Sequence, residues 1–320
     1  MKLTWRGVAA VLLFGTASMA SYAQFPDKPV KIIVPFTAGG STDVLSREFA
    51  QALSSVLGQS VVIDNRSGGD GAVGAQAAAR SVPDGYTALI GTNSTQVLNP
   101  LLTKSTPYEP AKDFAPICTL GRSKNVMYVR SSLPYKSLQE FLVDAKSQPD
   151  KFTFAYVSAG TRLAAELLLQ LGHVKLRGVP YRSTSGAFTD VAGGQVDVLF
   201  SDHVSAIPFV QAEKIRPLAV TGSERVKALP DVPTMIEAGL KSYEMQPWYA
   251  LYLPVQTPRA VVEKYIEATT AANKSSKMLT AREKLGVDEF LVCGTELSKF
   301  QSSETTRWGQ VVKDANIRPQ

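Results

Sequence analysis

Residues 30–43 read VKIIVPFTAGGSTD, an apolar strand pattern followed directly by a glycine loop and the start of a helix. The apolar run 30–36 predicts a buried strand, the loop 37–40 contains two glycines, and residues 41–43 are types that cap helices. A helix start with free backbone N–H groups binds carboxylate or phosphate, and glycine allows a ligand close to the backbone. The stretch therefore predicts an α/β unit with an anion site in its loop. Ordinary helix capping is the alternative, because such units are common in α/β proteins.

The helix predicted from this start is capped by residues 41–43, with Gly58 as its stop signal. Its apolar residues recur at helical spacing, which indicates one buried face. The residues predicted for that face are Leu45, Phe49, Leu53, Val56 and Leu57.

The first 23 residues have the pattern of a secretory signal peptide. Lys2 and Arg6 give a charged start, residues 8–17 are mostly apolar, and small residues before Gln24 suit cleavage after Ala23. The apolar run is too short to span a bilayer permanently. We therefore expect an exported chain, which in a Gram-negative cell means the periplasm.

Charge and composition argue against several classes of function. The formal net charge is +6, or +4 once Lys2 and Arg6 are removed with the signal, and the charges are scattered. This argues against nucleic-acid binding, whereas a mild positive balance suits an acidic small ligand. The two histidines, His173 and His203, are too few for a histidine-rich metal site, and the loop 37–40 lacks the lysine of a P-loop. We expect no metal and no cofactor.

The two cysteines, Cys118 and Cys293, lie far apart in the sequence. Export makes a disulfide chemically possible. Two separate buried thiols are the alternative, and the sequence leaves both open.

Strand and helix signals alternate along the rest of the chain, which is typical of an α/β protein. Further strands are predicted at residues 60–64, 87–91, 152–157, 176–181, 196–200 and 215–221. Further helices are predicted at 72–80, up to Gly172, up to Gly193, after His203 and, as a short one, up to Gly239. The chain after the signal is long enough for two lobes with separate cores.

The pattern of the first loop recurs in the middle of the chain. Residues 37–42 (TAGGST) open one helix and 158–161 (SAGT) open another; both helices end in Leu-Gly, followed by a strand and an Arg-Ser pair. We interpret these as equivalent units, one per lobe, whose helix starts lie at the carboxyl ends of two sheets, where such folds bind ligands. Two starts facing across a cleft would hold a molecule with two anionic groups. Chance recurrence of ordinary capping is the alternative.

Motifs spread over residues 25–319 match one family pattern. They are residues 29–47, Asp64-Asn65-Arg66 with Gly68-Gly69, PDGYT at 83–87, VPYR at 179–182, GGQVD at 193–197, LAVT at 218–221, LPDVPT at 229–234, and 248–258. Together they resemble the Bug (TctC-like) periplasmic solute-binding proteins of tripartite tricarboxylate transporters.

The resemblance implies a type II periplasmic binding protein fold, an α/β Venus-flytrap whose two lobes surround a central cleft and close on the ligand by hinge motion. It implies that residues 24–123 plus 246–320 form lobe I and residues 124–245 form lobe II. The crossovers are expected near residues 121–126 and 243–253.

The resemblance also implies that two loops grip a carboxylate ligand. Transferred to this chain, the first set is Ala38, Gly39, Gly40, Ser41 and Asp43, and the second is Ser158, Gly160, Thr161 and Arg162. The second loop is several residues shorter than the family pattern, which would withdraw backbone donors. Arg162 stands at or near a usual histidine and would add a cation able to bind a carboxylate in a bidentate manner. The alternative for Arg162 is that its side chain points to solvent. The alternative for Asp43 is that it only stabilises its helix, by interacting with the helix dipole.

Other side chains at predicted strand ends and at the second crossover are candidates for the cleft. They are Asn93, Thr95, Tyr181, Ser201, Asp202 and Trp248. A solvated turn is the alternative for Asn93 and Thr95, and core packing for Tyr181. Helix capping is the alternative for Asp202, and burial in the hinge for Trp248.

These patterns and the resemblance predict a monomeric periplasmic receptor that captures a small organic acid and delivers it to a tripartite tricarboxylate transporter (TTT) permease. A ligand-sensing module that docks on a membrane sensor kinase is the alternative from another class. A secreted serine hydrolase is the third, although a G-x-S-x-G elbow is missing and His203 beside Asp202 would need a serine within reach. We therefore expect a binding protein and no enzyme, with the particular carboxylate left open.

Overall fold

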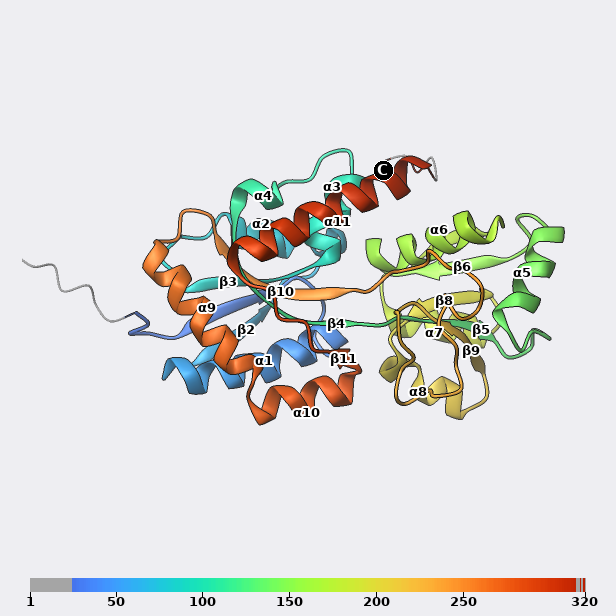
Figure 1. Cartoon of the computed structure of the whole chain (residues 1–320), viewed down its shortest axis with the longest axis horizontal. Coiled ribbons are helices and arrows are strands. Elements are labelled where there is room, and N and C mark those ends of the chain that lie inside the picture. Colours follow the sequence, from blue (N-terminus) through green and yellow to red (C-terminus); the bar gives the residue numbers. More distant parts are fainter. Residues whose placement is uncertain (1–24, 315–316, 318, 320) are drawn as a thin grey trace, which may run out of the picture.

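The computed structural model describes residues 25–314, 317 and 319. The predicted signal peptide, residues 1–23, lies outside the described residues. The chain forms two α/β lobes, each built around its own mixed sheet, and extended segments run between them (Figure 1). This confirms the predicted two-lobe Venus-flytrap architecture.

The sheet of lobe I has six strands. Their spatial order is β11 (Val287–Asp288), β4 (Phe114–Ser123), β10 (Trp248–Pro254), β3 (Thr87–Thr92), β1 (Val30–Val34) and β2 (Val61–Asn65). Strands β1, β2 and β3 are parallel, whereas β10 pairs antiparallel with both β3 and β4. The parallel strands therefore end at one edge of the sheet, and the loops after them lie together.

The sheet of lobe II has five strands. Their order is β7 (Arg177–Pro180), β6 (Thr153–Tyr156), β8 (Val198–Ser201), β5 (Val126–Arg130) and β9 (Ile215–Val220). Here β6, β7 and β8 are parallel, and β5 is antiparallel to both of its neighbours. Each lobe thus combines parallel βα units with antiparallel strands, which are β10 and β11 in lobe I and β5 in lobe II.

Two connections join the lobes. Residues 124–125 link β4 of the first sheet to β5 of the second, and residues 221–247 link β9 of the second sheet to β10 of the first. We propose residues 24–123 plus 246–320 and residues 124–245 as the extents of the two lobes.

The first βα unit shows why these residues fold as they do. Helix α1 (Ser41–Leu57) buries Leu45, Phe49 and Leu53 against the sheet, and Gly58 ends it in the left-handed conformation that glycine adopts without strain. Val56 was predicted for the buried face but is 45% exposed, because the helix turns it toward solvent at its last turn. Helices α9 (Arg259–Asn273) and α10 (Ser276–Leu285) pack beside α1.

The remaining helices cover both sheets. In lobe I they are α2 (Ala72–Ala79), α3 (Asn99–Leu102), α4 (Pro110–Asp113), α11 (Gly294–Asp314) and the short turns η1 (Gly69–Gly71) and η2 (Ser94–Leu98). In lobe II they are α5 (Leu138–Ser147), α6 (Ala159–Gly172), α7 (Thr184–Ala192) and α8 (His203–Gln211). The short helix predicted to end at Gly239 is wrong. Residues 235–239 form turns, closed by bonds such as the one from the Ala238 N–H to the Thr234 carbonyl at 2.9 Å.

Cys118 and Cys293 form a disulfide with an S–S distance of 2.06 Å, which settles the question left open by the sequence. It ties β4 to the segment before α11. Within the described ranges, the helices are too short or too polar to cross a bilayer.

Candidate functional site

A cleft of ≈ 900 Å³ lies between the lobes at the carboxyl ends of the parallel strands. Lobe I contributes residues after β1, β2 and β3, and lobe II contributes residues after β6, β7 and β8. Open α/β sheets bind ligands at such edges, because helix starts and loop backbones converge there. The cleft has the size of a small-molecule site.

The first loop leaves the start of α1 without a side-chain cap. Gly40, the residue before the helix, makes no side-chain capping hydrogen bond. A Cβ built on Gly40 would meet nothing closer than the Thr37 carbonyl oxygen at 3.7 Å, so a side chain fits there without a clash. Gly40, Ser41 and Thr42 all line the cleft. The start of α1 therefore brings backbone donors and two hydroxyls to the cleft, an arrangement that binds anions.

Asp43 stabilises this loop from inside the protein. It is 2% exposed, and its Oδ2 accepts hydrogen bonds from the Gly39 N–H at 2.9 Å and from Arg47 Nε at 3.0 Å. Its Oδ1 accepts from Asn65 Nδ2 at 2.9 Å. Burial acts to raise the pKa of Asp43, but the bonds from Arg47, Gly39 and Asn65 outweigh burial and lower it. Asp43 is thus an ionised side chain that holds the loop in place.

The second loop is capped by its own side chains. Ser158 and Thr161 form a capping box at the start of α6, with the Thr161 N–H donating to Ser158 Oγ at 3.2 Å and the Ser158 N–H donating to Thr161 Oγ1 at 3.0 Å. The Gly160 N–H donates to Ser94 Oγ of lobe I at 3.3 Å. The Ala159 N–H donates to Asp70 Oδ2, also of lobe I. The first-turn donors of α6 are therefore already paired.

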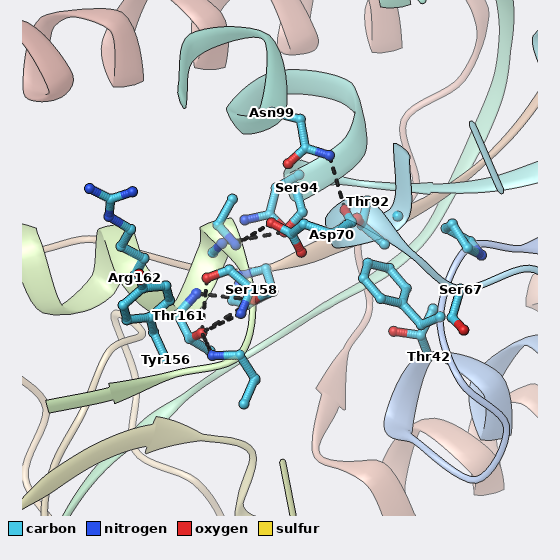
Figure 2. A pocket seen from close by; sticks show the side chains of 18 of the residues that line it. Thr42, Ser67, Asp70, Thr92, Ser94, Asn99, Tyr156, Ser158, Thr161 and Arg162 are labelled. Atoms are coloured by element: carbon cyan, nitrogen blue, oxygen red, sulfur yellow. Dashed lines mark hydrogen bonds between the residues drawn. The ribbon is translucent and has the colours of Figure 1, made fainter. Parts of the chain in front are cut away.

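Asp70 lines the cleft but was not among the residues predicted for the site; Thr42, Ser67 and Ser94 are further examples. Asp70 lies in η1, with φ 53° between Gly69 and Gly71. Burial raises its pKa to about 7, and the Ala159 N–H acts in the opposite direction. Figure 2 shows Asp70 and Ser94 directly against the start of α6, with Thr42 and Ser67 on the opposite side of the view. An aspartate among glycines in the loop after a strand is the sequence signal that could have found it.

Arg162 lines the cleft and forms an ion pair with Glu166 of the same helix. Its Nε lies 3.7 Å from Glu166 Oε1, and its guanidinium lies 5.7 Å from the centre of the Tyr156 ring. Burial raises the pKa of Glu166, and the Arg162 charge offsets part of that rise. Arg162 thus places a positive charge near the start of α6, where it lines the cleft. Its binding to a ligand stays a prediction.

Tyr181 and Asp202 are partly engaged within lobe II. The Tyr181 hydroxyl donates to Asp190 Oδ2 at 2.7 Å, and burial together with that carboxylate raises the pKa of Tyr181 to about 12. Asp202 caps α8: its Oδ1 accepts the Ser205 N–H at 2.8 Å and its Oδ2 accepts the Ser205 hydroxyl at 2.9 Å. Both residues line the cleft, yet each has the structural role considered as its alternative.

Most of the residues predicted for the site do line the cleft. These are Gly40, Ser41, Asn93, Ser158, Gly160, Thr161, Arg162, Tyr181, Ser201 and Asp202. Five described residues lie outside its lining: Ala38, Gly39, Asp43, Thr95 and Trp248.

Burial explains two of these exclusions. Thr95 is fully buried beneath the cleft floor, with its carbonyl bonded to the Tyr108 hydroxyl at 2.7 Å, so the solvated turn considered for it is wrong. Asn93, though in the lining, is 3% exposed and is no solvated turn either. Trp248 is 1% exposed in β10 and packs edge-on against Phe300. Its place is the hinge core.

Two α/β lobes around a cleft of this kind define a solute-binding protein of the Venus-flytrap class. The family model of the tripartite tricarboxylate transporter family receptor, TctC, matches residues 45–317. The chain belongs to this family of periplasmic solute-binding proteins.

Relatives and solved structures agree with this assignment. Protein BugT of Bordetella pertussis is 30% identical over 309 residues, which cover 95% of this chain and 94% of BugT. An R. palustris protein solved with adipate is 32% identical with a TM-score of 0.86, covering 92% of this chain and 100% of that one. MatC from Rhodopseudomonas palustris with bound malate is 31% identical with a TM-score of 0.80, covering 90% and 100%.

Proposed function

We propose that this protein captures a small carboxylate in the periplasm and delivers it to a TTT membrane permease. The observation that carries the proposal is the uncapped start of α1 in the cleft, where Gly40, Ser41 and Thr42 present donors to an anion. The adipate and malate complexes of two structurally similar proteins support a carboxylate as the ligand class.

Binding by this mechanism is reversible capture between two lobes. The ligand carboxylate accepts hydrogen bonds from the α1 start, and closure of the lobes removes water around those bonds. Hydrogen bonds to an ionised group are strong, and they strengthen further as the local dielectric falls. Arg162 on the opposite lobe adds a favourable positive charge to the closed cleft.

The experiment that tests the binding site replaces Gly40 with valine. A branched side chain there would lie beside the loop and keep the ligand from the backbone, so we expect affinity to fall at least about tenfold, or ~1.4 kcal/mol. A thermal-shift screen with organic acids first identifies a ligand, because a tight ligand raises the melting point by mass action. Isothermal titration then compares the variants.

Ala38→Val is the matched control, because Ala38 is exposed in the same loop and lies outside the cleft lining. It should bind as the wild type does. Equal affinities for Gly40→Val and Ala38→Val, both folded, would contradict the proposed site.

Transport and location are tested in the host cell. Deleting the partner permease genes should abolish uptake of the same acid, and cell fractionation should recover the processed chain from the periplasm. Uptake that persists without the permease, with loss of ligand-dependent gene induction instead, would favour the sensor alternative.

A further inference from the structure

The carboxylate of Asp70 lies where an anionic ligand of α6 would be expected. Its Oδ2 accepts the N–H of Ala159, the first residue of α6, and it reaches that helix from lobe I across the cleft. A carboxylate at the first turn of a helix is the arrangement that helix starts offer to bound anions. The protein therefore supplies its own carboxylate to the second loop.

This placement is unfavourable for the isolated loop. Asp70 has a left-handed backbone with φ 53° in a segment whose neighbours are glycines, and aspartate is strained there relative to glycine. Its Oδ1 is buried and, among the described residues, has no hydrogen-bond partner. A buried acceptor without a partner is destabilising. The local structure thus gives no reason for an aspartate, whereas the contact across the cleft does.

We propose that Asp70 occupies the position of a ligand's second carboxylate, so that this chain selects ligands with one carboxylate and an uncharged, hydrogen-bonding far end. The proposal rests on the proposed function, because it takes the α1 start as the site of the ligand's own carboxylate. A dicarboxylate would bring its far charge toward Asp70 and find the α6 donors occupied.

Two buried atoms, Asn93 Nδ2 and Asp70 Oδ1, indicate which chemical group the ligand carries at the end opposite its carboxylate. Asn93 Nδ2 is also buried without a partner in the described part of the chain, and a Cβ on Gly160 would lie 3.5 Å from it, which places this amide beside the first turn of α6. Asn93 Nδ2 is a donor and Asp70 Oδ1 is an acceptor, and both residues line the cleft. A hydroxyl can accept from one and donate to the other. The chemistry therefore favours a hydroxy acid whose hydroxyl lies at this end of the cleft.

The test uses acids of matched length on the full mature chain. The probes are adipate, hexanoate and 6-hydroxyhexanoate, with succinate, butanoate and 4-hydroxybutanoate as the shorter series. Titration calorimetry is done at pH 8, where Asp70, with its pKa of about 7, is mostly ionised. Of the two hydroxy acids, we take the one that the wild type binds more tightly. We expect its affinity to be at least about tenfold higher than that of the dicarboxylate of the same length.

Asp70→Gly is the decisive variant, because glycine adopts φ 53° without strain and removes the side chain from α6. It should raise affinity for a dicarboxylate at least about tenfold and lower affinity for the hydroxy acid. Asp70→Asn keeps an oxygen on the Ala159 N–H without the charge, so it should gain much less dicarboxylate affinity. Asp150→Gly is the matched control, since Asp150 is also left-handed (φ 61°) but exposed and remote from the cleft lining.

The outcomes separate this proposal from the proposed function. It is overturned if the wild type binds a dicarboxylate as tightly as the hydroxy acid, or if folded Asp70→Gly gains no dicarboxylate affinity. Equal gains in Asp70→Asn and Asp70→Gly also overturn it, because charge removal alone would then suffice. In these cases, a loss of binding in Gly40→Val still supports the carboxylate site at α1. If no acid binds any form, the proposed function fails and this proposal with it.

Discussion

Helices α1 and α6 occupy corresponding positions in the two lobes. Their starts differ in whether the protein itself supplies hydrogen-bond acceptors for the first backbone N–H groups. Gly40 precedes α1 without a side-chain cap, whereas Ser158 and Thr161 cap α6 reciprocally. Ser94 and Asp70 of the opposite lobe take the next two donors of α6. Similar sequences thus give one helix start that is open to a ligand and one that is occupied. A helix start binds an external anion only where its first N–H groups have no hydrogen-bond acceptor within the protein.

The largest expected difference between the two starts concerns pH. Asp70 has its pKa raised from 3.8 to about 7 by burial, so the folded chain binds its proton more tightly than the unfolded chain does. By linkage, its contribution to the free energy of unfolding falls as pH rises from about 4 to about 7, by a few kcal/mol at most. Burial and the Asp70 charge raise the pKa of the nearby Tyr108, which titrates above this window.

Urea unfolding at several pH values checks this, with Asp70→Asn as the comparison. The variant should lose part of the decline between pH 4 and 7. A pH profile identical to that of the wild type would contradict the buried state of Asp70.

The next effect concerns Asp43, the aspartate of the open start. Asp43→Ala removes acceptors from Gly39, Arg47 and Asn65, so we expect the free energy of unfolding to fall by about 2–3 kcal/mol and ligand affinity to fall with it. Because the pKa of Asp43 is lowered, its contribution is present at neutral pH and is lost on acidification, the opposite of Asp70. Chemical denaturation and titration calorimetry at pH 7 measure both effects.

Asp64→Ala is the control for Asp43. Asp64 makes a surface ion pair with Arg66 at 2.9 Å and should contribute less than about 1 kcal/mol. If the two variants lowered the free energy of unfolding equally, Asp43 would not stabilise the loop before α1 as we describe.

The smallest effect compares a serine from each helix start. Ser158→Ala removes the cap of α6 and should lower the free energy of unfolding by about 1 kcal/mol with little change in affinity. Ser41→Ala should leave stability nearly unchanged and weaken ligand binding by about 0.5–1.5 kcal/mol, because Ser41 lines the cleft and we propose that its hydroxyl binds the ligand. Melting curves and titrations of the two proteins give the comparison, and a reversed pattern would show that α6 is the binding loop.

Much of the fold could be predicted because its signals are local. The strands predicted for β1–β3 and β6–β9 agree with the structure within two residues, and α1 stops before Gly58 as predicted. The cap predicted at residues 41–43 is wrong, because Gly40 precedes the helix without a side-chain cap. Strands β4, β5 and β10 have no alternating pattern, because they lie in sheet centres and are buried on both faces. Helix α11 buries Leu297, Gln301 and Trp308, a face too sparse to recognise by periodicity.

The site was predictable in part for the same reason. Loops that follow strands could be placed at one sheet edge, which identified residues such as Gly40 and Gly160. The pairing of Asp70 with Ala159 could not be predicted, since these residues are 89 positions apart and meet only through the arrangement of the lobes. Likewise, the sequence of the second loop does not reveal that its donors are taken.

The most direct test of the difference between the helix starts is an amide NMR titration of the ¹⁵N-labelled mature chain with its carboxylate ligand. We expect the N–H resonances of Ser41 and Thr42 to move downfield as they donate to the carboxylate, while those of Ala159 and Gly160 change little. Large shifts at Ala159 and Gly160, with Ser41 and Thr42 unmoved, would contradict this expectation.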